Sequence, residues 1–179
     1  MRAHIETPDT PYVMLAQEGA AFVSAAFEQA LANHEIDRGG LFDRHLEPVA
    51  GTDPAQFMAK YTTLCDRRLR TFQDELAARL PGVVFCAAVD DRGYLPTHNS
   101  KYSKPQTHDP VFNAANCRNR RIFDDRVGLA AGRNTAGPLV QTYRRDMGGG
   151  TFVLMKDVSV PIFVDGRHWG GFRLGYRLP

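Results

Sequence analysis

One stretch of the sequence, residues 82–100 (GVVFCAAVDDRGYLPTHNS), limits the choice of folds more than any other. Its apolar run from Val83 to Val89 is short and rich in β-branched residues, which is typical of a fully buried strand. The Asp-Asp-Arg-Gly segment that follows predicts a tight turn, because Gly93 can adopt a positive φ angle. The chain is then expected to return as a second strand that carries Tyr94 and His98 and leads into a polar loop.

Two long amphipathic helices are predicted ahead of this hairpin. The first is expected over residues 12–34, where apolar side chains recur at helical spacing, with Pro11 near its first turn. An irregular segment over 41–54 leads to a second helix, expected over 54–80, which Asp53 can cap. The first helix either covers its own sheet alone or also joins a partner molecule.

Short helices and three antiparallel strands are predicted after the hairpin. The short helices are expected over 111–115, with Asp109 as cap, and over 119–127, with Gly128 as terminator. The Asp165-Gly166 pair is the strongest hairpin signal in the chain. The three strands are expected over residues 138–146, 151–164 and 167–178.

This order of elements predicts an α+β domain, built on a five-stranded antiparallel sheet with helices on one face and preceded by the two long helices. Residues 1–80 are expected to form a helical segment that packs on a sheet domain over residues 81–179, as one compact unit overall. A cavity between the sheet and the helices is a usual position for a small ligand.

Composition and charge fit an ordinary globular domain and exclude several classes of protein. The chain of 179 residues is long enough to build a core without disulfides or structural metals. Its cysteines, Cys65, Cys86 and Cys117, are odd in number and widely spaced, which predicts reduced thiols. A net charge of +2 gives no argument for nucleic acid, and no apolar run is long enough for membrane insertion. Without a recognisable export signal, the chain is expected in the cytoplasm.

Seven blocks of the sequence together point to one family. They are ETPDTP at 6–11, LFD at 41–43, PVAGTDP at 48–54, VVFCAAVDDRGYLPTHN at 83–99, NRRIFDDRVG at 119–128, LVQTYRRDMG at 139–148 and GRHWGGFRLGY at 166–176. Together they resemble the PAS-like or Cache-like sensory domain found at the C-terminus of many bacterial methyl-accepting chemotaxis proteins. The resemblance covers nearly the whole chain and implies a ligand-sensing domain, coupled in larger relatives to a helical signalling rod. This chain contains no heptad-rich signalling helices or methylation region, so it is either an excised domain or a stand-alone sensor that works through a partner.

Arginines supply the first group of candidate ligand-binding residues. Arg118 and Arg121 share a face of the expected helix, and a guanidinium aimed into a cavity suits a carboxylate or a phosphate. The alternative is a solvated basic face with surface ion pairs. Tyr143 and Arg145 share one face of their strand. An Arg turned inward on a sheet is costly unless paired, so it marks a ligand site or a buried salt bridge.

The other candidates lie on the hairpin and on the last strand. His98 and Asn99 stand where the chain leaves the sheet, and His98 either contacts a ligand, metal or haem iron or bonds the backbone of its own loop. Trp169 and Arg173 alternate onto one face of the last strand, where Trp169 either lines the pocket or packs under the helices. The full candidate set is Tyr94, His98, Asn99, Arg118, Arg121, Tyr143, Arg145, Trp169 and Arg173.

The leading interpretation is a cytoplasmic sensor domain in chemotaxis or related signal transduction. It would bind a small ligand between the sheet and the helices and signal through its N-terminal helix to a chemotaxis protein or to a second copy of itself. The alternative is a redox or gas sensor that binds haem or a metal through His98 or His108. An enzyme is not expected, because no nucleophile motif, phosphate loop or paired metal spacing is present. A structural dimer module with a vestigial pocket is the remaining possibility.

Overall fold

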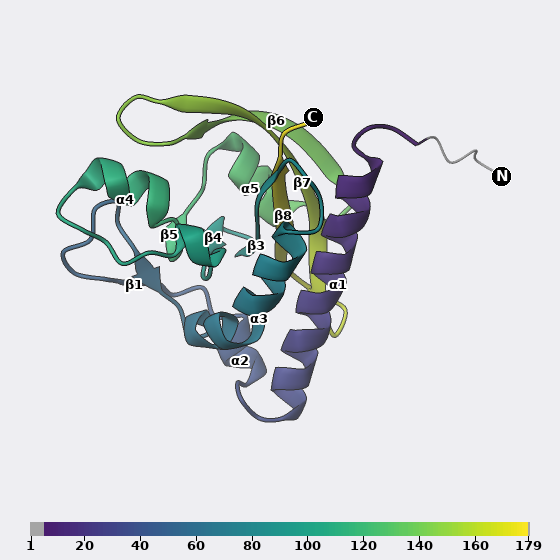
Figure 1. Ribbon diagram of the computed structural model, residues 1–179. Helices are drawn as coiled ribbons and strands as arrows, with labels where there is room; N and C mark the ends of the chain where they lie inside the picture. Colours follow the sequence, from purple (N-terminus) through teal and green to yellow (C-terminus); the bar gives the residue numbers. More distant parts are fainter. Residues whose placement is uncertain (1–5, 179) are drawn as a thin grey trace.

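The computed structural model describes residues 6–178 as an α+β fold (Figure 1). The helices are α1 (Thr10–Ala32), α2 (Arg38–Leu41), α3 (Thr62–Ala77), α4 (Pro110–Asn116) and α5 (Arg126–Arg133), with a short 3-10 helix over Ser100–Tyr102. The strands are β1 (Glu47–Pro48), β2 (Phe57–Met58), β3 (Val83–Asp90), β4 (Tyr94–Leu95), β5 (Arg121–Ile122), β6 (Leu139–Asp146), β7 (Phe152–Val164) and β8 (Arg167–Tyr176).

The main sheet is antiparallel and has four strands in the order β3-β8-β7-β6, so the five-stranded prediction is wrong. The expected fifth strand is reduced to β4, which has two residues and pairs with β5 outside this sheet. Side chains cap the free edge of β3 instead. Asn99 Oδ1 accepts from the Cys86 N–H at 2.9 Å, and Gln73 Oε1 accepts from the Ala88 N–H at 3.3 Å. These amide oxygens bind backbone donors that a fifth strand would otherwise have to satisfy.

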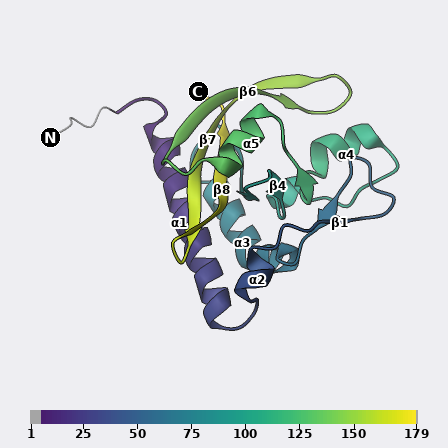
Figure 2. The ribbon, with the colours of Figure 1, turned by 180° about the vertical axis from the view of Figure 1, so that it is seen from behind.

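Helices cover both faces of the main sheet, not one face as the sequence predicts. Helices α1 and α3 lie on one face (Figure 1), and α5 lies on the other, where it is seen in front of the sheet from behind (Figure 2). Glycines permit the close approach on both sides. A Cβ on Gly19 of α1 would lie 2.2 Å from the Phe172 ring. A Cβ on Gly171 of β8 would lie 2.4 Å from the Ala131 carbonyl oxygen of α5.

One continuous hydrophobic core joins α1, α3 and the main sheet. Trp169 lies fully buried in this core, with its ring centroid 4.9 Å from that of Phe27 and 5.3 Å from that of Tyr61. Its indole N–H donates to the Leu41 carbonyl at 3.0 Å. The core crosses the predicted boundary between residues 1–80 and 81–179, and that division stays a prediction.

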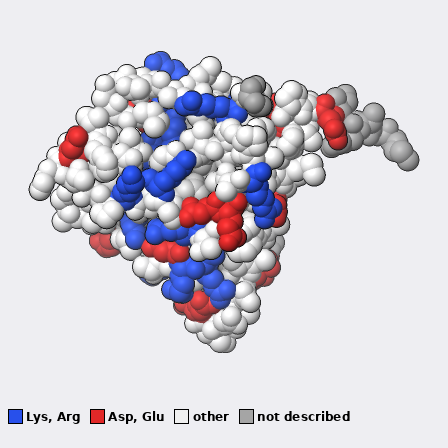
Figure 3. Space-filling view, viewed as in Figure 1, with Lys and Arg blue, Asp and Glu red and all other residues white. Residues whose placement is uncertain are grey.

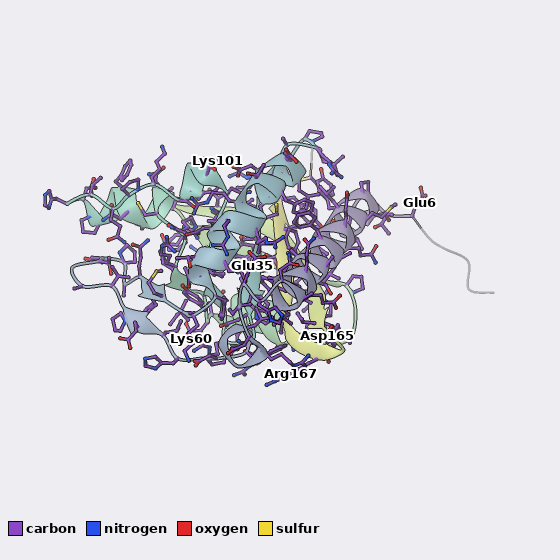
Figure 4. All side chains as sticks on the ribbon, turned by 90° about the horizontal axis from the view of Figure 1, so that it is seen from below. Glu6, Glu35, Lys60, Lys101, Asp165 and Arg167 are labelled. Carbon is purple, nitrogen blue, oxygen red and sulfur yellow. The ribbon has the colours of Figure 1, made fainter. Side chains whose placement is uncertain are left out.

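The turns of the sheet follow the local sequence closely. The β7–β8 turn has positive φ angles at Asp165 (49°) and Gly166 (80°), as a two-residue type I′ hairpin requires. Gly93 has a φ of 84° in the β3–β4 turn, and a Cβ there would lie 2.2 Å from the Phe123 carbonyl oxygen. Figure 4 shows Asp165 beside Arg167 at the β7–β8 turn, where Asp165 forms an ion pair with Arg38 of α2 at 2.9 Å.

Two of the predicted helices are placed wrongly. Helix α3 begins at Thr62, not at Pro54, and the segment before it is irregular apart from β2. The helix predicted over 119–127 is β5 followed by α5, because the Phe123 N–H donates to the Gly93 carbonyl at 2.8 Å and holds this segment against the hairpin turn. Gly128 therefore lies inside α5 and does not end a helix. The Asp109 cap of α4 is confirmed, since its carboxylate accepts from the Val111 N–H at 2.9 Å.

Charged side chains of both signs lie close together on the face seen in Figure 3. Helix α3 contributes two arginine ion pairs: Arg68 pairs with Glu35, which follows α1, and Arg70 pairs with Asp66 one turn away, at 3.1 Å. Within residues 6–178, every helix is too short or too polar to cross a bilayer.

Candidate functional site

The candidate site is a pocket of about 280 Å³ on the α5 side of the main sheet. Strands β3, β6 and β8 form its floor, and the chain between β4 and α5 forms its wall. This volume is close to the lower limit of roughly 300 Å³ that is usual for small-molecule sites. The lining residues are Phe85, Leu95, His98, Arg118, Arg121, Ile122, Phe123, Asp124, Asp125, Tyr143, Arg144, Arg145, Asp146 and Arg173.

Arg145 is the most unusual residue of the pocket, because it is 2% exposed and has no carboxylate partner among the described residues. Its guanidinium lies 4.8 Å from the ring centroid of Phe85 and 4.7 Å from that of Tyr102. Both Nε and Nη2 are buried without a hydrogen-bond partner. These two nitrogens form one edge of the guanidinium, the edge that can bind two oxygens of a carboxylate at once. Burial lowers the pKa of Arg145, which means that its charge is held at a cost.

Arg173 lies in the same pocket but, unlike Arg145, has a carboxylate partner. Its Nε donates to Oδ2 of Asp157 at 3.0 Å, its Nη2 forms an ion pair with the same oxygen at 2.9 Å, and both side chains are buried. Burial raises the pKa of Asp157 to about 6, although Arg173 acts in the opposite direction. The same edge of the guanidinium therefore has a carboxylate partner in Arg173 and no partner among the described residues in Arg145.

Two further arginines come from the chain that forms the wall, and the guanidinium of Arg118 extends to β6 of the floor. Arg118 Nη1 donates to the carbonyl oxygens of Ala114 and Asp146, both at 2.8 Å, and Arg121 Nη1 donates to Ala114 at 3.2 Å. Both guanidiniums lie over the Phe123 ring, at 5.3 and 4.9 Å from its centroid. Burial and the neighbouring Arg145 lower the pKa of Arg118 to about 9. Carbonyls orient these groups but do not neutralise them, so the pocket carries uncompensated positive charge.

His98 is buried among these arginines and is held in one orientation. Its Nδ1 accepts from the Asn99 N–H at 2.8 Å, which leaves Nε2 as the nitrogen available to the pocket. Its ring packs against Phe85 and Tyr102 at centroid distances of 5.3 and 5.1 Å. Burial, and then the charge of Arg145, hold the pKa of His98 well below its usual range. His98 is therefore a neutral imidazole at physiological pH.

The depressed pKa of His98 predicts a specific loss of stability in acid. An unfolded chain protonates this histidine below pH 6.5, whereas the folded protein does not, so the free energy of unfolding falls as the pH drops below 6.5. Asp157, with its raised pKa, contributes the opposite slope between pH 3.8 and 6, where its stabilisation is lost as the pH rises. We expect His98→Asn, which keeps an acceptor for the Asn99 N–H, to flatten the acid side of the profile.

Urea unfolding between pH 4 and 8 measures this effect, and the comparison of the variant with the original chain cancels the Asp157 contribution. As a control of opposite sign, Asp157→Asn should steepen the fall in acid. Parallel profiles for His98→Asn and the original chain would show that His98 takes up protons normally in the folded state.

The acidic residues of the pocket have a different environment from the arginines. Asp124, Asp125 and Asp146 are exposed, whereas Arg118, Arg145 and Arg173 are buried. We call the three aspartates the pocket mouth and the three buried arginines the arginine floor.

Six of the nine predicted site residues line the pocket: His98, Arg118, Arg121, Tyr143, Arg145 and Arg173. The other three lie elsewhere. The Tyr94 hydroxyl donates to the Phe57 carbonyl at 2.6 Å, and Asn99 caps the edge of β3. Trp169 lies in the α1 core, on the opposite side of the sheet from Arg173, because a β-bulge between the Ile162 and Phe163 pairings breaks the expected alternation of β8.

Sequence reasoning missed eight lining residues: Phe85, Leu95, Ile122, Phe123, Asp124, Asp125, Arg144 and Asp146. Phe85 could have been found, since alternation along β3 places it on the same face as Ala87 and away from Cys86. Asp124 and Asp125 had no such signal, because their position depends on the chain leaving β5 and entering α5.

The comparisons with known proteins leave the family of this chain open. No family model matches the sequence, and no curated protein matches it. Among solved structures, one similar chain is an extracellular ligand binding receptor from Desulfohalobium retbaense DSM5692, with 17% sequence identity and a TM-score of 0.41. The match covers 92% of this chain and 25% of that chain, so this chain spans about a quarter of that protein's length. The functional argument therefore depends on the pocket.

Proposed function

We propose that this chain is a sensory domain that binds a small anionic molecule in the pocket and signals through α1. The observation that supports it best is the buried Arg145, whose Nε and Nη2 have no acceptor. A protein keeps an unpaired charge in its interior at a cost in stability, and a ligand that supplies the missing counter-charge removes that cost on binding.

The chemistry of the pocket selects a compact carboxylate or phosphate. A guanidinium binds either group through two parallel hydrogen bonds. The floor adds Arg118, whose pKa is lowered by burial and by Arg145, and this mutual repulsion is relieved when an anion binds between them. The volume of about 280 Å³ limits the ligand to the size of a small metabolite.

The route from the pocket to α1 passes through β7 and β8. Asp157 binds the pocket residue Arg173, and the adjacent Lys156 faces the opposite side of β7, where its Nζ donates to Asp9 at 3.0 and 3.1 Å. Tyr176 of β8 also donates to Asp9, at 2.7 Å, and stacks on Tyr12 with 4.1 Å between ring centroids. A ligand that shifts β7 and β8 would therefore act directly on the first turn of α1.

The role in chemotaxis rests on the resemblance described above. In this proposal the domain acts on a chemotaxis signalling protein or on a second copy of itself. The cytoplasmic location and the absence of enzymatic activity stay predictions.

No structural observation favours haem or a metal as the sensed group. His98 lies among four guanidiniums that oppose a cation, and His108 is exposed. Among residues 6–178, no three His, Cys, Asp or Glu side chains gather in a way that could hold a metal ion.

Thermal unfolding in the presence of small probes tests this function. A ligand that binds only the folded state raises the melting temperature in proportion to the logarithm of its concentration. We expect a saturable increase with at least one short carboxylate or with phosphate, and no increase with the matched primary amide. If every carboxylate and phosphate probe leaves the melting temperature equal to that with sodium chloride, the proposed function is wrong.

Hydrogen exchange tests the signalling part of the proposal with the same probe. Binding should change the protection of amides in the first two turns of α1, and Asp9→Asn should reduce that change without preventing binding. A probe that binds but leaves α1 protection unaltered would disprove signalling through this helix.

A further inference from the structure

Positively and negatively charged side chains lie at different depths in the pocket. The arginine floor is buried, and the carboxylates of the pocket mouth are exposed to water. Among the described residues, Asp124, Asp125 and Asp146 have no ion-pair partner, although arginines line the same pocket. Two arginines also line the outer part of the pocket: Arg144 is exposed and lies 4.5 Å from the ring centroid of Phe152, and Arg121 is half-buried, where Asp146 acts against the lowering of its pKa by burial. Three carboxylates against these two arginines leave an excess of negative charge at the mouth, whereas the buried end of the pocket carries the other three arginines.

Aromatic rings line the pocket beside the arginines. Phe85, Phe123 and Tyr143 all line the pocket, and Phe85 is buried beneath Arg145 and Arg173. Phe123 lies against the guanidiniums of Arg118 and Arg121 in the wall. These rings favour hydrocarbon in the middle of the ligand.

We propose that the natural ligand is a carboxylate that carries a cationic group at the other end of a short hydrocarbon chain, as in an ω-amino acid. The inference rests on the proposed function and specifies its ligand class. The carboxylate would bind the unpartnered edge of Arg145 in the floor, the chain would lie against the aromatic rings, and the cation would remain at the mouth. A dicarboxylate of the same length would place its second charge beside three carboxylates. An α-amino acid would place both of its charges at the same depth.

Six small probes of related length separate these classes by isothermal titration. They are butanoate, 4-aminobutanoate, 2-aminobutanoate, succinate, pentanoate and 5-aminopentanoate. The exposed aspartates are partly screened, so we expect at least one ω-amino acid to bind about three- to tenfold more tightly than its unsubstituted acid. Succinate should bind more weakly than butanoate, and 2-aminobutanoate should have no advantage over butanoate.

The double substitution Asp124→Asn with Asp125→Asn tests whether the mouth is responsible. It should remove the advantage of the ω-amino acid while leaving the affinity for its unsubstituted acid equal or higher. The double substitution Glu6→Gln with Glu47→Gln, at exposed acids outside the pocket, is the matched control for net charge and should preserve the advantage.

The outcomes distinguish this inference from the function on which it rests. If each ω-amino acid binds no more tightly than its unsubstituted acid, the inference is wrong and anion binding stands. Tighter binding of 2-aminobutanoate than of 4-aminobutanoate would also overturn it, because the two charges would then be recognised together. If none of the six probes binds and phosphate does, the ligand class is wrong; if phosphate also fails, the proposed function fails as well.

Discussion

Replacing Arg145 with Met is expected to make the ligand-free protein more stable and to prevent it from binding small carboxylates. The side chain is 2% exposed, and its Nε and Nη2 have no acceptor. Methionine has a similar length and no charge to desolvate. Removing a buried charge of this kind should raise the free energy of unfolding by about 1–3 kcal/mol. Contacts with the Phe85 and Tyr102 rings offset part of the gain.

The same substitution removes the group that would face the ligand carboxylate. Truncating one member of a buried charge pair costs about 2–5 kcal/mol, so we expect affinity for the best carboxylate probe to fall by about 100-fold or more. Urea unfolding measures the stability, and isothermal titration measures the affinity.

Arg167→Met is the matched control, since Arg167 is an exposed strand arginine that lies over the Phe42 ring and does not line the pocket. It should change stability by less than about 1 kcal/mol and leave binding nearly intact. A loss of stability in Arg145→Met with binding retained would mean that Arg145 is a structural residue with partners in solution. The proposal that the pocket binds an anion would then lose its main support.

The sequence predicted the strands of the sheet well because their signals are local. Periodicity, Gly-rich turns and the Asp165-Gly166 pair depend only on neighbouring residues, and β6, β7 and β8 lie within a few residues of their predicted bounds. Alternation along β6 predicted that Tyr143 and Arg145 share a face, and both line the pocket, although alternation alone did not show which face points inward.

The errors concern features that depend on distant contacts. The missing fifth strand results from Asn99 and Gln73 binding the β3 edge, and no local pattern shows that an amide will replace a strand. The position of Trp169 depends on a bulge, which shifts alternation by one residue and moves the side chain to the other face. The sequence also could not show that Arg173 has a carboxylate partner and Arg145 has none, because the two arginines and Asp157 lie on three different strands.

Asp90 gives the largest expected loss of stability, because its buried carboxylate holds the end of β3 and the turn that follows. The side chain is fully buried. Its Oδ2 accepts from the Tyr61 hydroxyl at 2.5 Å and from Arg92 Nη2 at 2.7 Å. Its Oδ1 accepts from the backbone N–H groups of Arg92 and Tyr94, at 2.8 and 3.2 Å. This buried network links the Asp-Asp-Arg-Gly turn to the core, so the conformation of the turn depends on tertiary contacts as well as on its local sequence.

Asp90→Ala would leave the Tyr61 hydroxyl and the Arg92 guanidinium without their acceptor. Breaking a buried charged network from one side costs about 3–5 kcal/mol, so a large fraction of the stability of the domain should be lost. The adjacent Asp91 provides the control, because its side chain is 43% exposed and, within residues 6–178, forms an ion pair with Arg44 alone, at 2.7 Å. Asp91→Ala should cost no more than about 1 kcal/mol. Equal losses in the two variants, measured by urea unfolding at pH 7, would show that the hairpin depends on the turn sequence alone and not on the buried carboxylate.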